Sequence, residues 1–129
     1  MKKFGFSRNE RLAGKKRIEK LFLKGHSFQS GFFRVYWEEC SSSAKNPAQL
    51  LIAVPKKKIK LATSRNRIKR MVREAYRLNK SLLLDGLNEK EKKIQFAIVF
   101  TANEIPVFMA IREKIILLLQ RLLKEVNGN

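Results

Sequence analysis

The residues with the clearest chemical potential are the arginines and lysines of residues 64–80, SRNRIKRMVREAYRLNK, the most basic run in the chain. Arginine outnumbers lysine in this run, and its planar guanidinium makes forked hydrogen bonds to phosphate oxygens. Glu74 is the single acid among seven cationic side chains. Because crowded like charges repel one another, the pattern predicts that this run binds a polyanion.

Residues 64–84 are expected to form the helix that presents these cations, with Ser64 or Thr63 as its N-cap and with its end at Asp85 and Gly86. At about 100° per residue the apolar side chains fall on one face and the cations on the opposite one. A solvated surface helix and a membrane-surface helix are the alternatives. Membrane-surface helices usually carry Trp or Phe on their apolar side, whereas the apolar face here consists of Ile68, Met71, Val72, Ala75 and Leu78.

Side chains that could catalyse a reaction are scarce. His26 is the only histidine and lies in a Gly-flanked segment, while Cys40 is the only cysteine. Glu38 and Glu39 are adjacent, so in a strand they point to opposite faces. The chain also lacks a phosphate-binding glycine loop and paired metal-ligand spacings. The sequence therefore predicts a binding protein with no catalytic residues and no cofactor of its own.

The composition points to a nucleic-acid partner. The 129 residues carry 29 Lys and Arg against 11 Asp and Glu, which gives a formal net charge of +18. A chain of this length is expected to form a single RNA-binding domain over residues 1–129, with residues 1–14 as a basic N-terminal arm. The lone cysteine and the absence of a signal peptide or a membrane span of ~20 apolar residues predict a cytoplasmic protein without a membrane partner.

The hydrophobic pattern predicts an α+β fold in which three helices pack on a small, mostly antiparallel sheet, in the order αβββαβα. We expect a helix at 15–24, a turn at 25–31 and a strand from residue 32 to residue 39. The apolar run 49–54 is typical of a central strand covered on both faces. After the basic helix we expect a strand at 94–101 and a final helix with Pro106 in its first turn and Thr101 or Asn103 as its cap.

The strand at 32–39 has two different faces. Phe33, Val35 and Trp37 alternate toward the core, whereas the other face mixes aromatic and charged side chains, including Tyr36. Such a mixture suits the stacking of nucleic-acid bases beside cations. Tyr36 could equally be a structural tyrosine, and for Phe22 the residues alone favour core packing.

Several motifs resemble the bacterial ribonuclease P protein subunit. The run Arg65-Asn66-Arg67-Ile68-Lys69-Arg70 followed by Arg73-Glu74-Ala75-Tyr76 is similar to the RNR signature of that family. The lead-in also matches in order and spacing, with a strand ending at Val54, then Pro55-Lys56-Lys57 and eight residues before Asn66. The similarity extends from Arg11-Leu12 to the terminal helix.

The resemblance implies a cytoplasmic protein that joins a large catalytic RNA to remove 5′ leaders from precursor tRNA. The RNA would hold the Mg²⁺ ions and perform the hydrolysis, and the protein is expected to be a monomer in a 1:1 complex. The family fold has a left-handed βαβ crossover, an exception to the usual handedness. By position, the catalytic RNA would be contacted by Arg65, Asn66, Arg67, Lys69, Arg70 and Arg73, with Lys56 and Lys57 adjacent.

The resemblance also implies a cleft for the single-stranded 5′ leader, formed here by Ile18, Phe22 and Tyr36. The family often has an aromatic residue where this chain has Ile18, so stacking would fall to Phe22 and Tyr36. The alternative function is that of a ribosomal protein or general RNA chaperone without a catalytic partner. A DNA-binding module is a third hypothesis, for which Asn66 among the arginines is the only support.

Overall fold

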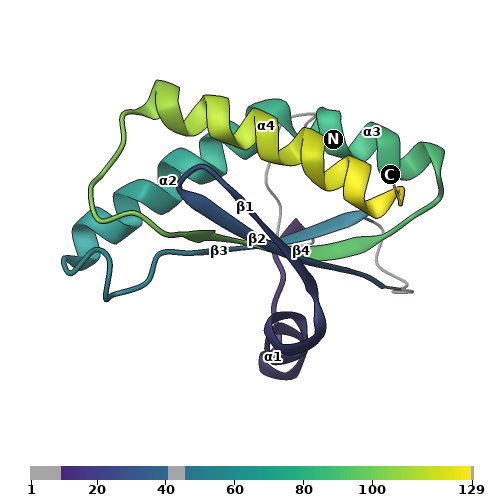
Figure 1. The fold of residues 1–129 in the computed structure, drawn as a ribbon, viewed down its shortest axis with the longest axis horizontal. Coiled ribbons are helices and arrows are strands. Elements are labelled where there is room, and N and C mark those ends of the chain that lie inside the picture. Colours follow the sequence, from purple (N-terminus) through teal and green to yellow (C-terminus); the bar gives the residue numbers. More distant parts are fainter. Residues whose placement is uncertain (1–9, 41–45, 129) are drawn as a thin grey trace.

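A computed structural model describes residues 10–40 and 46–128 of the chain. A four-stranded sheet separates three helices on one face from a single helix on the other (Figure 1). The elements follow one another as α1 (Lys15–Lys24), β1 (His26–Ser30), β2 (Phe33–Glu39), β3 (Ala48–Ala53), α2 (Ala62–Asn79), α3 (Ser81–Glu89), β4 (Ile94–Phe100) and α4 (Phe108–Val126). The fold is therefore α+β, as the hydrophobic pattern predicts.

The strands lie in the order β1-β2-β4-β3. β1 and β4 pair antiparallel with β2, whereas β3 pairs parallel with β4. A parallel pair needs a crossover connection, and here α2 and α3 supply it. The left-handed sense of this crossover stays a prediction.

The main core lies between the sheet and the layer formed by α2, α3 and α4. Phe33, Val35 and Trp37 of β2 point into it, in agreement with the expected alternation. Tyr76 of α2 is fully buried and meets Phe96 of β4 with ring centroids 6.0 Å apart. The sequence predicts Leu78 on the apolar face of the basic helix, but its side chain is 41% exposed. The reason is that the buried face of α2 includes Tyr76 in place of Leu78.

Two of the strand expectations are wrong. Residues 26–30 form strand β1 instead of a turn, because Phe28 is buried in the main core and the segment pairs along its length with β2. Gly31, with φ of +59°, forms the tight turn between the two strands. β3 lies at the edge of the sheet and not at its centre; its outer side is partly covered where Leu12 donates its amide hydrogen to the carbonyl oxygen of Leu50.

The expected helix at 64–84 is two helices, so the chain has four helices in its described part instead of three. α2 ends at Asn79, and Lys80 joins it to α3. Gly86 lies inside α3, and a Cβ atom there would come within 2.5 Å of the Leu123 side chain of α4. This glycine therefore permits close packing of two helices and is not a helix stop.

The helix starts also differ from expectation. α2 begins at Ala62 with Leu61 as its N-cap, and α4 begins at Phe108 after Pro106 with Val107 as its N-cap. Neither helix has a side-chain cap. No helix in the described ranges is both long and apolar enough to span a membrane.

The part of the N-terminal arm that the structure describes is packed against the domain; residues 1–9 lie outside the described ranges. Leu12 is buried in a second, smaller core with Leu21 and Ala97, between α1 and the sheet. Glu10 is also buried, and its carboxylate oxygen lies 2.7 Å from Nζ of Lys80. This ion pair fastens the arm to the junction of α2 and α3.

Candidate nucleic-acid interface

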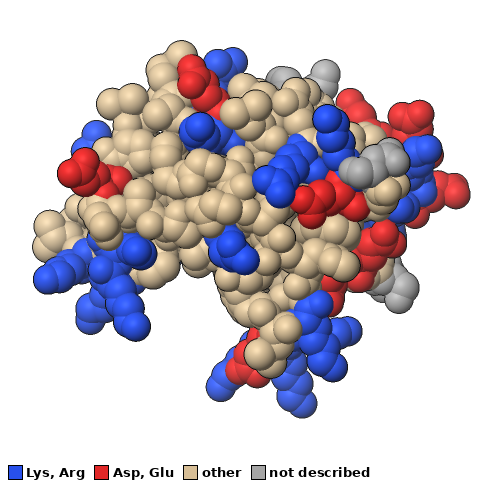
Figure 2. Space-filling view, in the orientation of Figure 1, with Lys and Arg blue, Asp and Glu red and all other residues tan. Residues whose placement is uncertain are grey.

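The cations are concentrated in one part of the chain. Residues 1–80 contain 22 of the 29 Lys and Arg and only five of the 11 Asp and Glu, whereas residues 81–129 are nearly balanced. Figure 2 shows Lys and Arg gathered over α1 and over the connection from β3 to α2, whereas at the right-hand end Asp and Glu are mixed with Lys and Arg. The surface is hollowed between the two basic groups. The fold therefore presents most of its positive charge on one side.

The central residues of the RNR run lie on the solvent-facing side of α2. Asn66, Arg67 and Arg70 are exposed and Lys69 is half-buried. Lys56 and Lys57 are exposed in the connection that leads to this helix. Within the described residues, Arg67 and Arg70 make no hydrogen bond or ion pair, so their guanidinium groups are available to a ligand.

Arg65 is used differently. Its Nη1 donates to the carbonyl oxygen of Ile59 at 3.0 Å and to that of Lys60 at 2.7 Å. These contacts hold the connection between β3 and α2 against the first turn of the helix. Arg65 is thus in part a structural residue, and the number of donors that it can offer to a ligand is reduced.

Arg73 lies at the edge of a hollow of about 170 Å³ between α2, β3 and the N-terminal segment. Arg11 and Lys69 also line this hollow, together with the apolar residues Leu12, Leu50, Leu51 and Ile52. The Nε atom of Arg73 is buried and has no hydrogen-bond partner in the described chain. Burial lowers the pKa of Arg73, and the nearby charge of Arg11 lowers that pKa further. An anion in the hollow would relieve both effects.

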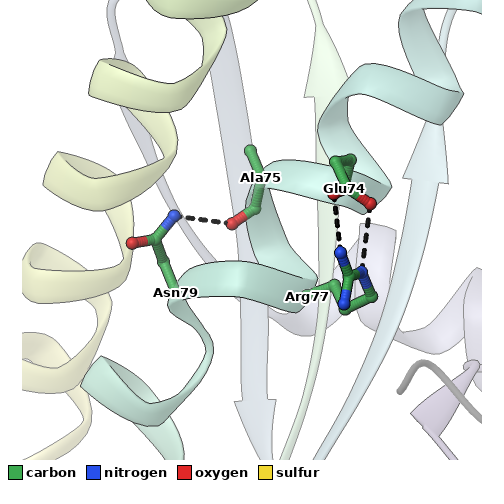
Figure 3. A network of polar contacts seen from close by, with 4 residues as sticks. All are labelled: Glu74, Ala75, Arg77 and Asn79. Carbon is green, nitrogen blue, oxygen red and sulfur yellow. Dashed lines mark hydrogen bonds and ion pairs between the residues drawn. The ribbon is translucent and has the colours of Figure 1, made fainter. Parts of the chain in front are cut away.

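Arg77 continues the basic face, but its guanidinium is bound to Glu74 (Figure 3). Nε and Nη2 of Arg77 lie 3.0 and 2.7 Å from the two carboxylate oxygens of Glu74. This forked hydrogen bond lowers the pKa of Glu74 and raises the pKa of Arg77. In the next turn Asn79 donates to the carbonyl oxygen of Ala75 at 2.8 Å. Glu74, the one acid of the basic run, is therefore paired with Arg77, the last arginine of α2.

Ile18, Phe22 and Tyr36 are brought together on the face of the sheet that carries α1, and we call this group the α1–β2 patch. The rings of Phe22 and Tyr36 meet edge to face with centroids 4.8 Å apart. Ile18 and Tyr36 are partly buried against the small core, whereas Phe22 is exposed. The guanidinium carbon of Arg34 lies 5.6 Å from the centroid of the Tyr36 ring. The patch thus combines exposed ring surface with a cation.

Other functional-looking residues have structural partners. His26 begins β1 and its ring stacks on Trp37 with centroids 4.5 Å apart, which gives it a packing role. Arg17 of α1 donates to the side chains of Gln49 and Gln95. Sequence reasoning missed Arg11 as a neighbour of Arg73, because no local pattern places an arm residue beside the middle of a helix.

Comparisons with known proteins identify the family of this chain. A family model described as ribonuclease P matches residues 6–124. The ribonuclease P protein component of Porphyromonas gingivalis is 36% identical over 126 residues, which cover 98% of this chain and 89% of that protein. The corresponding protein of Chlorobaculum tepidum is 31% identical over 125 residues, which cover 90% of this chain and 81% of that protein.

The fold has a counterpart among solved structures. The ribonuclease P protein of Thermotoga maritima superimposes with a TM-score of 0.70 at 29% sequence identity, covering 87% of this chain and 96% of that one. Sequence, fold and the placement of the RNR run on an exposed helix thus lead to one conclusion. This chain belongs to the family of ribonuclease P proteins, the protein components of the ribonucleoprotein that processes the 5′ ends of tRNA.

Proposed function

We propose that this protein binds the catalytic RNA of ribonuclease P through α2 and the connection before it, and binds the 5′ leader of precursor tRNA through the α1–β2 patch. Family membership supplies its role as the protein subunit of an endoribonuclease whose catalyst is RNA. The assignment of surfaces rests on the geometry of the chain. The observation that carries it is the separation of exposed, unpaired cations on α2 from exposed aromatic surface on the opposite side of the sheet.

The RNA-binding surface is expected to act mainly on phosphates. Arg67 and Arg70 can make forked hydrogen bonds to phosphate oxygens. Asn66 and Lys69 add further polar contacts beside them. Lys56 and Lys57 extend the positive surface beyond the start of α2. Folded RNA crowds its phosphates, and cationic side chains replace the counterions that would otherwise be needed to neutralise them.

Arg65 and Arg73 have narrower roles in this proposal. Arg65 fixes the connection through two backbone carbonyls, so it positions Lys56 and Lys57 in addition to any contact of its own. Arg73, Arg11 and Lys69 line the hollow beside β3 and together would bind a phosphate there.

The α1–β2 patch fits a single-stranded leader because unpaired bases can stack on exposed rings, whereas a duplex keeps its bases stacked inside. Phe22 and Tyr36 supply the rings, and Ile18 supplies an aliphatic surface beside them. Arg34, whose guanidinium carbon lies 5.6 Å from the centroid of the Tyr36 ring, and the exposed cations of α1 would bind the leader backbone. Such a site would recognise the leader with little dependence on its sequence.

The Mg²⁺ ions of the reaction are assigned to the RNA. In the described part of the chain no three or more His, Cys, Asp and Glu side chains are grouped as metal ligands need to be. We further propose a 1:1 complex of protein and RNA in the cytoplasm.

The direct test is cleavage of 5′-labelled precursor tRNA by the catalytic RNA at low Mg²⁺, with and without the protein. Addition of the protein should restore cleavage at the mature 5′ end, and the protein alone should cut nothing. If the RNA gains no activity at any protein concentration or salt, the proposed function is wrong.

The leader assignment has its own test. Tyr36→Ala removes a stacking surface, so it should weaken binding of precursor tRNA to the holoenzyme by about tenfold while binding of mature tRNA stays unchanged. Tyr36→Phe keeps the ring and serves as the matched control. An equal loss for precursor and mature tRNA would show that the patch does not contact the leader.

A further inference from the structure

A second hollow lies at the N-terminal end of α2, within the region assigned above to the catalytic RNA and away from the hollow beside Arg73. It has a volume of about 350 Å³ and opens between two connections, the one from β3 to α2 and the one from β4 to α4. Figure 1 shows the two connections at the same end of the molecule. The hollow is lined by Lys58, Ile59, Lys60, Leu61, Ser64, Asn103 and Ile105. None of these residues is part of the expected RNA-binding set or of the α1–β2 patch.

The lining combines three kinds of chemistry. Ile59, Leu61 and Ile105 provide apolar surface, and Leu61 is 68% exposed although it is a large aliphatic side chain. Ser64 and Asn103 provide a hydroxyl and an amide, and within the described residues neither forms a hydrogen bond with another side chain. Two lysines stand at the rim. An apolar floor with a few polar groups and cations at its edge suits a small planar ligand that is attached to an anion.

The walls are held in place before any ligand arrives. The amide hydrogens of Lys58 and Ile59 are both donated to the carbonyl oxygen of Pro55, at 3.0 and 3.2 Å. Arg65 binds the carbonyl oxygens of Ile59 and Lys60 from the other side. The side chain of Ile59 is buried in the main core. The entropy cost of ordering this connection is therefore met on folding and not on binding.

Two exposed apolar side chains follow Ile105 in the chain. Val107 and Met109 are 71% and 58% exposed at the start of α4. Within the hollow itself, the exposed side chains of Leu61 and Ile105 lie together with two lysines, and such a group is typical of an interaction site. Glu104 is the only acid in residues 54–61 and 101–107, so the charge around the hollow favours an anionic partner.

We propose that this hollow receives an unpaired nucleobase of the catalytic RNA. The inference rests on the proposed function, because it requires α2 to lie on that RNA. The base would lie against Leu61 and Ile105, its edge would meet the amide of Asn103, and the flanking phosphates would meet Lys58 and Lys60. The hollow adjoins the N-terminal turn of α2, so an RNA chain bound along Arg67 and Lys57 passes it. An amide can both donate to and accept from a base edge, which allows base preference at this position.

The first experiment compares RNA binding across a salt series for two exposed double variants. Leu61→Ser with Ile105→Ser should weaken binding of the catalytic RNA by about tenfold, without changing the slope of log affinity against log salt, because no phosphate contact is lost. Lys58→Ala with Lys60→Ala should lower that slope by about 2. Leu117→Ser, at an exposed position of α4, is the control and should change neither quantity. Melting curves check folding, and Asn103→Ala gives a second variant that removes no apolar surface.

The outcomes separate this inference from the proposed function. If the wild-type protein binds the RNA and the serine pair and Asn103→Ala bind it equally well, the nucleobase pocket is wrong and the proposed function stands. If the wild-type protein does not bind the RNA at all, the proposed function itself fails. A change in the salt slope for the serine pair would also overturn the inference, because it would mean that phosphates and not a base occupy the hollow.

The second experiment identifies the occupant. A benzophenone maleimide attached to Ile105→Cys in a Cys40→Ser background is irradiated in the assembled holoenzyme with precursor tRNA bound. We expect the adduct at an unpaired nucleotide of the catalytic RNA; an adduct in the leader would contradict the assignment. In the free protein, cytidine and adenosine monophosphates should shift the backbone amide signals of Leu61 and Ile105 more than ribose 5-phosphate does. Equal shifts would also contradict it.

Discussion

α2 and α4 pack side by side on the same face of the sheet, yet they use their cations in different ways. In α4, Arg121 lies 3.1 Å from Glu125, donates to the carbonyl oxygen of Gln29 and covers the Phe28 ring at 4.5 Å. In α2, Arg67 and Arg70 extend from the helix without such contacts in the described chain. A cation with partners inside the chain stabilises the fold, whereas a cation without them can bind RNA where it lies on the surface that faces the RNA. Charge alone does not distinguish the two roles.

Among the cations that have partners inside the chain, Lys80 is expected to give the largest loss of stability when it is replaced. Lys80→Met leaves the Glu10 carboxylate buried without its 2.7 Å partner, so the free energy of unfolding should fall by about 3 kcal/mol. Urea unfolding followed by circular dichroism measures this. The double variant Glu10→Leu with Lys80→Met removes both charges and should recover most of the loss. An unchanged midpoint for Lys80→Met would show that the arm is not fastened by this pair.

Removal of two unpaired cations from α2 should have the next largest effect. Arg67→Ala with Arg70→Ala is expected to weaken binding of the catalytic RNA by about 100-fold, because two charge-assisted contacts are lost. The salt slope should fall by about 2, and thermal stability should stay the same. Filter binding across a salt series measures both quantities.

The matched control removes two charges from α4, as Arg112→Ala with Lys124→Ala, and should leave the salt slope unchanged. If the two pairs of substitutions weaken binding equally, net charge and not the surface of α2 determines affinity. That result would remove the distinction between the two helices.

Arg121→Ala tests whether this cation of α4 is structural. The substitution removes a contact with the Phe28 ring and a hydrogen bond to the backbone of β1. We expect a loss of about 1 kcal/mol in the free energy of unfolding with RNA affinity unchanged. A weaker complex with unaltered stability would instead place Arg121 among the RNA-binding residues.

Arg77 should give the smallest effect, because its guanidinium is already bound to Glu74. Arg77→Ala should leave RNA affinity within about threefold of the wild type, since exposed ion pairs contribute little. The pKa of Glu74 should rise toward its ordinary value, because the hydrogen bond from Arg77 is the main cause that lowers it. An NMR pH titration follows that carboxyl group.

The sign of the linked effect on stability follows from that lowered pKa. In the wild type the pair stabilises the fold above the unfolded-state pKa of Glu74, and this contribution is lost as the pH falls through the folded-state pKa. Arg77→Ala should remove that pH dependence. An unchanged Glu74 titration would mean that the forked contact does not persist in solution.

Much of the fold could be predicted because the relevant signals are local. The alternation of Phe33, Val35 and Trp37 and the apolar period of α4 each depend on a few neighbouring residues, so they survive in the structure. The segment of β1 could not be predicted, because its polar residues and the flanking Gly25 and Gly31 resemble a turn, and only pairing with β2 makes it a strand. The sequence predicts a helix end at Gly86, and this prediction is wrong. Glycine is needed there because the side chain of Leu123, 37 positions away in the chain, packs against it.

By itself, the sequence determined that the protein is a basic α+β domain, that the cations of residues 65–73 lie on a helix opposite its apolar face, and which family the RNR run resembles. Only the tertiary structure decided which cations are available. It bound Arg65 to the carbonyls of Ile59 and Lys60, placed Arg11 beside Arg73, and brought Asn103 to the start of α2. The physical reason is that residue type fixes charge and helical period, whereas partners are contributed by segments that meet only after folding.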